Sequence, residues 1–313
     1  MILTPCQIKA ETEFDAFLAS DEKEFVLSGF SGVGKTFVTE RFLDKLDKRN
    51  TFLRDVLNMT PYALYLTATT NKAVRVLHSV VQALDVDIDV RTIYSVLGLK
   101  LRKDFKTGKE KVVTTSETKT FHNSIVFIDE ASYADDALKE FVLTYFSDSC
   151  KIVWIGDKDQ LLAVNYEQSP VLDNPDLKHV VHMVTPKRNQ GSINKLAHEF
   201  RNVLYGAPWP VIKETPEIEI VKGAVFKSLV ERLYQSDEYK KDSNYVRILG
   251  WTNNKVLSYN SFVRQLYTST VSYVQGEYLT TNSAVLSGTD ILLPSDYTLK
   301  IRDVSSVKMD QYN

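Results

Sequence analysis

The 313-residue chain has 43% hydrophobic residues, a formal net charge of −2 and two cysteines. Its length and apolar content suffice for one large or two ordinary hydrophobic cores. The balanced charge excludes a surface that attracts polyanions as a whole, and Cys6 and Cys150, outside any C-x-x-C motif, argue against a disulfide framework. The N-terminus lacks an apolar signal segment and no run approaches membrane-spanning length, so we expect a cytoplasmic protein without a membrane anchor.

Apolar and amphipathic segments alternate along the chain. The apolar segments predict strands at Phe25–Leu27, Ala63–Thr67, Ile125–Ile128, Lys151–Ile155, His179–Val184 and Val246–Trp251. The amphipathic segments predict helices around Glu11–Ser20, Lys35–Lys48, Lys72–Leu84, Asp136–Phe146, Ile193–Leu204 and Asn254–Tyr267. This alternation predicts an α/β fold in which helices cover both faces of a parallel sheet and ligands bind at the carboxyl ends of its strands. The Gly- and Pro-rich stretch Tyr205–Gly223 predicts a connector into a second region.

The segment after the first predicted strand reads GFSGVGKT and matches the phosphate-binding P-loop pattern G-x-x-x-x-G-K-[ST]. Glycines let consecutive backbone N–H groups wrap a polyphosphate, and the positive end of the following helix faces the same anion. Lys35 can reach the β- and γ-phosphates, and the Thr36 hydroxyl can ligate Mg²⁺. We therefore expect a nucleotide to be bound by Gly29, Gly32, Val33, Gly34, Lys35 and Thr36. A Gly-rich turn without a ligand is the alternative.

A basic segment, Lys100–Lys119, carries seven Lys or Arg residues against three acidic ones. A turn signal, Lys106–Lys109, lies between two apolar runs, so we expect a basic hairpin at about 98–122. Such a hairpin either contacts nucleic acid or is an ordinary solvated surface hairpin.

Asp129 and Glu130 end a strongly apolar predicted strand. One carboxylate there can hold Mg²⁺ and the other can deprotonate an attacking water, which phosphoryl transfer to water requires. Acidic strand ends are common, so the pair becomes specific only together with the P-loop. Gln160 follows the next predicted strand, where an amide can sense a γ-phosphate or be a polar loop residue.

In chain order, eight segments resemble the serial motifs of superfamily-one DNA helicases. They are Gln7 in LTPCQ, GFSGVGKT, LTATTNKAVRVL, Thr92–Ser95 (TIYS), IDEAS, GDKDQL, TPKR and WTN. The RecD-like branch, and within it the small phage Dda-type helicases, is the most similar, and the resemblance covers Leu3 to about Arg264. It implies a RecA-like P-loop NTPase domain at 1–185, which carries the hairpin, and a second, incomplete RecA-like domain at 186–313.

The resemblance also assigns the nucleotide site, with ATP and Mg²⁺ as the cofactors. It implies that Gln7 reads the adenine edge, unless it is an ordinary helix-entry residue. Lys35 and Thr36 contact phosphate and metal, Asp129 is linked to Mg²⁺, and Glu130 is the general base. Gln160 senses the γ-phosphate. Arg188 reaches from the second domain to the transferring phosphoryl group, or else pairs with a surface acid.

The same resemblance implies a path for single-stranded or fork DNA. Phosphate contacts position such a strand without reading its sequence. The residues concerned are Thr67, Thr69, Asn71, Lys72, Thr92, Ser95, Thr252 and Asn253, with Lys106 and Lys109 of the hairpin separating the strands.

The expected function is an ATP-dependent DNA helicase or translocase of 5′ to 3′ polarity, in the host cytoplasm if a phage encodes it. The late motifs of the family, a Gln-Gly segment and a Thr-Arg pair, do not follow Arg264. A complementing C-terminal polypeptide or replication proteins are therefore expected as partners. Two alternatives stay open: an inert nucleotide- and DNA-binding helicase fragment or subunit, and a P-loop kinase that transfers phosphate to an acceptor other than water.

Overall fold

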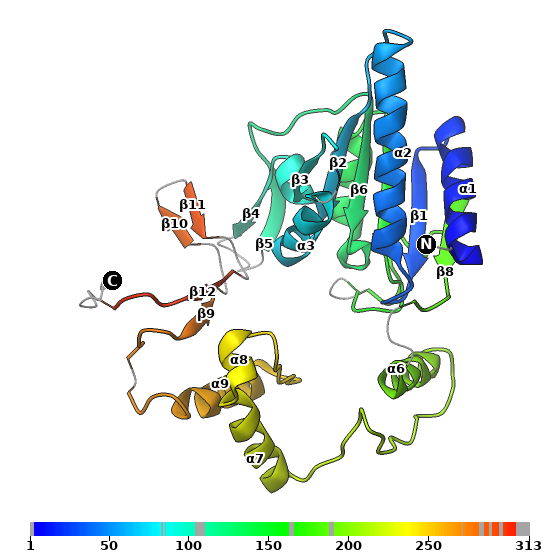
Figure 1. Cartoon of the computed structure of the whole chain (residues 1–313). Coiled ribbons are helices and arrows are strands. Elements are labelled where there is room, and N and C mark those ends of the chain that lie inside the picture. The colour runs from blue at the N-terminus through cyan, green and yellow to red at the C-terminus, as the bar shows by residue number, and fades with distance from the viewer. Residues whose placement is uncertain are drawn as a thin grey trace. The chain divides into compact units, whose positions relative to one another are not determined.

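The computed structural model divides into two compact units, Met1–Pro210 (unit 1) and Val211–Asn313 (unit 2) (Figure 1). It describes residues 3–82, 84, 86–103, 110–162, 166–187, 191–270, 272–281, 285–287, 290–293 and 297–304. Unit 1 includes helix α6 (Ser192–Val203), whose Arg201 contacts Asp157 and Asp159. Both cysteines are free thiols.

Unit 1 is built on a six-stranded parallel sheet with the strand order β3-β2-β6-β7-β1-β8 (Figure 1). The strands are β1 (Glu24–Gly29), β2 (Ala63–Ala68), β3 (Asp89–Thr92), β6 (Ser124–Asp129), β7 (Lys151–Gly156) and β8 (His179–Met183). Five of them confirm the strands predicted in this region. The strand β3 was not predicted, because Asp-Val-Arg-Thr contains one apolar residue, and it forms by pairing with β2 from Tyr65 to Ala68.

Helices cover both faces of this sheet, as the alternation of segments predicts. The helices of unit 1 are α1 (Pro5–Ala19), α2 (Lys35–Asp55), α3 (Asn71–Val81), α4 (Ile93–Val96), α5 (Asp136–Tyr145) and α6. Alternate residues of β1 point into different cores: Phe25 and Leu27 pack with α1, α2 and α3, whereas Val26 packs with α4 and α5. Because both faces are buried, β1 reads as a continuous apolar run.

The predicted basic hairpin is present. Strands β4 (Leu99–Lys103) and β5 (Glu110–Thr114) pair antiparallel, from Leu99 with Thr114 to Lys103 with Glu110. The turn residues Lys106 and Lys109 lie outside the described residues.

Unit 2 contains three helices and two pairs of antiparallel strands in its described part. They are α7 (Gly223–Tyr234), α8 (Asp237–Lys241) and α9 (Asn253–Gln265), with β9 (Tyr278–Thr280) paired to β12 (Thr298–Lys300) and β10 (Val285–Ser287) to β11 (Asp290–Leu293). The predicted strand at Val246–Trp251 is wrong. This apolar segment is irregular, and the side chains of Leu249 and Trp251 are 92% and 97% exposed.

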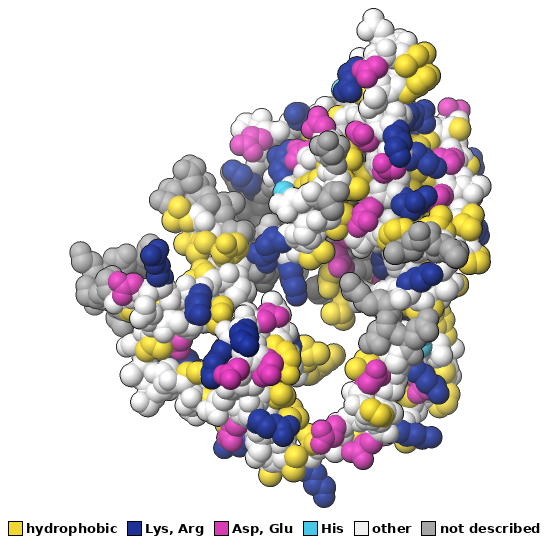
Figure 2. Space-filling model, viewed as in Figure 1, with side chains coloured by type: hydrophobic (Ala, Val, Ile, Leu, Met, Phe, Trp, Pro, Cys, Tyr) yellow, Lys and Arg dark blue, Asp and Glu magenta, His cyan; other side chains and the backbone are white. Residues whose placement is uncertain are grey.

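Charges of both signs are interspersed over the visible face of unit 1 (Figure 2). On α2, for example, Lys45 lies 2.7 Å from Asp15 of α1 and Lys48 lies 2.6 Å from Asp44. This agrees with the balanced net charge. None of the helices in the described part of the chain has the length and apolar character needed to cross a membrane.

Candidate active site

The P-loop joins the carboxyl end of β1 to the first turn of α2, and its backbone has the conformation that the glycines allow. Gly32 and Gly34 have φ angles of 85° and 90°, in the left-handed region that side chains disfavour. A Cβ at Gly29 would lie 2.6 Å from the carbonyl oxygen of Met183 in β8, so only glycine fits there. Val33 is fully buried in the core below the loop. The loop is therefore held between β1, β8 and α2.

Lys35 closes this loop from inside. Its Nζ donates to the carbonyl oxygens of Gly29, at 2.6 Å, and Phe30, at 3.3 Å. Burial lowers the pKa of Lys35, and the nearby carboxylates of Asp157, Asp129 and Glu130 oppose that shift. A partly buried ammonium group that donates only to neutral carbonyl oxygens of its own loop would gain energy from an anion placed against it.

The acidic pair stands at the carboxyl end of β6, two strands from β1 in the sheet. Burial raises the pKa of Asp129 to about 6, although the N–H of Glu130 donates to its Oδ1 at 2.8 Å. Glu130 has a φ of 54°, which is uncommon for a residue with a side chain. Backbone strain of this kind is concentrated at functional sites, where surrounding contacts hold it. Here Thr69 donates to the Glu130 carbonyl oxygen at 3.3 Å.

The donors at this edge fit a magnesium ion that is shared with phosphate. Mg²⁺ prefers oxygen ligands and is usually held by one or two protein oxygens together with phosphates and waters. The Thr36 hydroxyl and the Asp129 carboxylate supply oxygens of this kind. Within the described ranges, no cluster of three or more His, Cys, Asp or Glu residues could bind a metal by itself. A metal held jointly with the nucleotide therefore suits the residues present.

The loop after β7, Gly156–Gln160, lies against the turn that follows Glu130. A Cβ at Gly156 would be 3.3 Å from the backbone nitrogens of Ala131 and Ser132. The side chain of Gln160 is exposed, and the backbone N–H of Gln160 donates to the carbonyl oxygen of Asp157 at 3.1 Å. The strand order β6-β7-β1 thus brings the acidic pair, this loop and the P-loop to one edge.

The same loop forms contacts that the sequence did not predict. The Asp157 side chain is only 5% exposed and forms an ion pair with Arg201 of α6. Arg201 also contacts Asp159 at 2.8 Å. These pairs cannot be predicted from a local motif, because the partners are far apart in the sequence. For example, 44 positions separate Asp157 and Arg201.

Gln7 is both a helix-entry residue and a neighbour of the P-loop. It forms a capping box with Thr4: its Oε1 accepts from the Thr4 N–H at 2.9 Å, and its own N–H donates to the Thr4 hydroxyl at 3.3 Å. A Cβ at Gly34 would lie 2.8 Å from the Gln7 Nε2. The amide group is therefore buried beside the loop, with its oxygen engaged by the backbone.

Five of the residues expected to line a DNA strand lie at or just after the ends of β2 and β3: Thr69, Asn71, Lys72, Thr92 and Ser95. Ala68 and Thr92 are paired in register, so α3 and α4 both begin just beyond the carboxyl ends of these two strands. Thr92 caps α4 by accepting from the N–H of Ser95 at 3.1 Å, and the side chains of Ser95 and Lys72 are exposed. Asn71 is the first residue of α3.

Thr67 does not fit this expectation. Its side chain is fully buried, and its hydroxyl donates to the carbonyl oxygen of Phe127 at 2.8 Å. It connects β2 to β6 inside the sheet, so its hydroxyl is not available to a ligand.

The remaining expected residues lie elsewhere. Thr252 and Asn253 are exposed and begin α9 of unit 2, where the Thr252 hydroxyl accepts from the Lys255 N–H at 3.2 Å. Arg188 lies outside the described residues, just after Lys187, whose N–H donates to the carbonyl oxygen of Gly32 at 2.8 Å.

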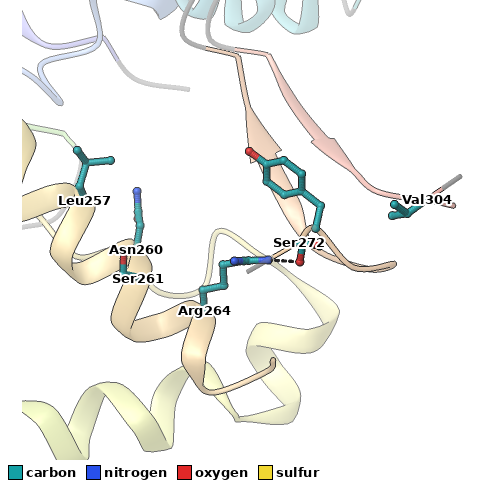
Figure 3. A pocket seen from close by; sticks show the side chains of 7 residues that line it. Leu257, Asn260, Ser261, Arg264, Ser272 and Val304 are labelled. Carbon is teal, nitrogen blue, oxygen red and sulfur yellow. Dashed lines mark hydrogen bonds between the residues drawn. The ribbon is translucent and has the colours of Figure 1, made fainter. Parts of the chain in front are cut away.

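Unit 2 has a cavity of about 520 Å³ that contains none of the expected nucleotide-site residues (Figure 3). It is lined by Leu257, Asn260, Ser261, Arg264, Ser272, Tyr273 and Val304. The guanidinium of Arg264 is held by Glu277, at 2.5 Å, and by the carbonyl oxygen of Ser272. The charge at this cavity is thus already paired within unit 2.

Comparisons with known proteins agree with this architecture. Residues 14–165 match a family model described as an AAA domain. The uncharacterised protein R530 of Acanthamoeba polyphaga mimivirus is 25% identical over 319 residues, which cover 90% of this chain and 60% of the viral protein.

Among solved structures, unliganded Pif1 from Bacteroides sp. has a TM-score of 0.50 at 15% identity, covering 96% of this chain and 64% of that one. The Pif1 helicase from Candida albicans has a TM-score of 0.45 at 15% identity, covering 97% and 69%. The chain thus spans less than two thirds of the viral protein and of the Bacteroides Pif1 chain. Together with the parallel sheet and the P-loop, the similarity to the Bacteroides Pif1 structure shows that the chain has a RecA-like P-loop NTPase fold.

Proposed function

We propose that this protein is an ATP hydrolase of the DNA-helicase type, which uses ATP and Mg²⁺ to move along single-stranded or fork DNA. The observation that carries the proposal is the meeting of three motifs at the ends of adjacent strands. These are the P-loop after β1, the acidic pair after β6 and the loop with Gln160 after β7. Such a set supports phosphoryl transfer to water, because it combines phosphate binding, metal binding and a general base.

Each residue has a distinct role in this proposal. The P-loop N–H groups and Lys35 bind the β- and γ-phosphates, and Thr36 and Asp129 would hold the magnesium ion. When bound, Mg²⁺ neutralises charge on the phosphates. Glu130 accepts the proton of the attacking water, and its backbone conformation fixes the direction of the carboxylate. Gln160 contacts the γ-phosphate, and Arg188 stabilises the charge of the transferring group.

The DNA path in this proposal runs over the ends of β2 and β3. The side chains of Thr69, Lys72 and Ser95, with Asn71 and Thr92, contact phosphates of the strand, while Thr252 and Asn253 supply contacts from unit 2. The β4–β5 hairpin separates the strands. We leave Thr67 out, since its hydroxyl is buried. The 5′ to 3′ polarity and a place in the RecD-like, Dda-type branch are further parts of the proposal, supported by the order of the motifs.

Phosphate release tests the proposal directly. Purified protein with Mg–ATP should release phosphate faster when an oligothymidylate is added, and Lys35→Ala should abolish the release. Unwinding of duplexes with a 5′ or a 3′ single-stranded tail then tests polarity. ATP binding without phosphate release would favour the inert nucleotide- and DNA-binding protein. Phosphate transfer to an acceptor other than water would favour the kinase.

A further inference from the structure

Arg201, near the end of α6, joins that helix to the loop that carries Gln160. Its Nη2 pairs with Asp157, whose side chain is almost completely buried, and its Nε lies 2.8 Å from Asp159 Oδ2. Asp159 also accepts a hydrogen bond of 2.6 Å from the hydroxyl of Tyr205, a residue two positions beyond the end of α6. One guanidinium group thus spans two carboxylates of the same short loop. A planar guanidinium presents separate N–H groups to the two carboxylates in a fixed geometry, whereas the ammonium group of a lysine lacks this fork.

The same helix touches the P-loop. The guanidinium carbon of Arg201 lies 5.0 Å from the centroid of the Phe30 ring. His198, three residues earlier, meets that ring edge-on at 4.4 Å. Phe30 in turn offers its carbonyl oxygen to Lys35. The helix α6 therefore contacts two of the three motifs at the nucleotide site through neighbouring side chains.

These polar contacts matter because α6 adds no buried side chain to the core. A helix that buries an apolar face is fixed by packing, whereas α6 lies on unit 1 with every side chain at least partly exposed. Its position is therefore more easily changed than that of α1 or α2, both of which contribute buried residues to the core.

Electrostatic interactions connect the Arg201–Asp157 ion pair to Lys35, where the terminal phosphate of a nucleotide would bind. Asp157 lies between two cations: it pairs with Arg201 and also attracts Lys35 electrostatically, while Arg201 repels Lys35. An anion bound at Lys35 neutralises that cation and attracts Arg201. The strength of the Arg201–Asp157 interaction therefore depends on whether the terminal phosphate is present.

We propose that Arg201 is a positioning residue that couples the terminal phosphate of the bound nucleotide to the position of α6. This inference rests on the nucleotide site of the proposed function. Since α6 is the last helix before the connector into unit 2, the coupling passes the state of the nucleotide to the part of the chain that leads out of unit 1.

Hydrogen exchange of the α6 amides in the full chain tests this. Exchange is compared with saturating Mg–ADP and with a non-hydrolysable Mg–ATP analogue. The two nucleotides should differ by about fivefold or more in α6, the lower end of typical coupling between sites. The variant Asp159→Asn keeps the Arg201–Asp157 pair, so it should fold. In this variant the difference should fall below about twofold, while analogue affinity stays within about threefold of wild type.

Three further variants sharpen the test. Asp148→Asn is the matched control, since it breaks the exposed pair with Lys23, at 3.4 Å, and should behave as wild type. Tyr205→Phe removes one of the two donors to Asp159 and should give an intermediate difference. Arg201→Lys keeps the charge without the fork, and should lose the coupling as Asp159→Asn does.

The outcomes separate this inference from the proposed function. Equal α6 exchange with both nucleotides in the wild type, or an unchanged difference in Asp159→Asn, would overturn the inference alone, provided that the P-loop amides are protected. No protection of the P-loop by either nucleotide would overturn both. Protection and a responsive α6 without DNA-stimulated hydrolysis would support the coupling and overturn the helicase proposal.

Discussion

Lys35 shows how the site is prepared for an anion. Its ammonium group is partly buried and donates to carbonyl oxygens of its own loop, which are weaker partners than a phosphate oxygen. We predict that Lys35→Ala lowers the rate of ATP hydrolysis by at least about 10²-fold, because a donor to the transferring group is lost. Binding of single-stranded DNA should stay within about threefold, since the proposed DNA contacts are made by other residues. Loss of DNA binding with ATP binding intact would contradict the assignment.

Glu130 is held in a left-handed conformation that costs energy, and strain of this kind is concentrated at functional sites. The change Glu130→Gln keeps the size of the side chain and removes the base. Turnover should fall by about 10²-fold or more while Mg–ATP still binds. Steady-state phosphate release and nucleotide titration measure the two quantities. Turnover at the wild-type rate would remove Glu130 from the mechanism.

Asp129 makes the stability of the nucleotide-free protein depend on pH. Its pKa is raised by burial from 3.8 to about 6, so the folded chain binds this proton more tightly than the unfolded chain. The free energy of unfolding is therefore greatest below the ordinary pKa of this carboxyl group. It falls as the pH rises from there through about 6, because the buried group then has to lose its proton. Asp129→Asn should be more stable than wild type by about 1–3 kcal/mol at pH 8, and the difference should shrink to about 0.5 kcal/mol or less near pH 4. Urea unfolding at both pH values checks this, and a difference independent of pH would contradict it.

At the scale of elements, the sequence predicts best the strands that are buried on both faces. The strands β1, β6 and β7 read as unbroken apolar runs because helices cover both sides of them. Val246–Trp251 is also rich in apolar residues, although it contains Arg247 and Gly250, and it forms no strand. Composition records a preference for a pleated, buried surface, whereas a strand also needs a partner, and no ladder pairs with this segment in the described part of unit 2.

Only the parts of the candidate site that lie in local sequence motifs could be located from the sequence. The P-loop, the acidic pair and Gln160 could be placed because each directly follows a predicted strand and parallel strands end at one edge. Arg201 could not be predicted, since its role depends on a helix that returns to the loop after β7. The burial of Thr67 could not be predicted, because a threonine in a buried strand and one at its end look alike in the sequence.

The β4–β5 hairpin supports a prediction about strand separation. Reversing the charge of Lys106 and Lys109 should impair duplex unwinding more than DNA-stimulated ATP hydrolysis, because a separating element acts on the duplex and not on the nucleotide. The matched control reverses Lys45 and Lys48, two lysines of α2 that form ion pairs within unit 1. Unwinding and phosphate release are measured on the same preparations. An equal loss of both activities would make the hairpin a general binding surface.

At the scale of the whole molecule, the residues of the nucleotide site lie in unit 1, which ends at Pro210. We predict that a fragment of residues 1–210 binds Mg–ATP within about threefold of the full chain. A fragment that ends at Lys178 lacks β8 and should not bind, since β8 supports both β1 and the P-loop. Fluorescent-nucleotide titration of the two fragments checks this. Equal binding by both would show that β8 is dispensable for the site.

The place of β1 in the sheet has a consequence for biosynthesis. It pairs with β7 and β8, which are made more than 120 residues later, as in the pairing of Phe25 with Val153 and with His179. Until those strands leave the ribosome, the P-loop strand has no neighbour on either side, and its apolar residues stay exposed. Contacts so distant in sequence form slowly, because a long loop must close before they stabilise the chain. The nascent protein therefore carries its nucleotide-binding sequence from the start, yet can use it only after β8 has been synthesised.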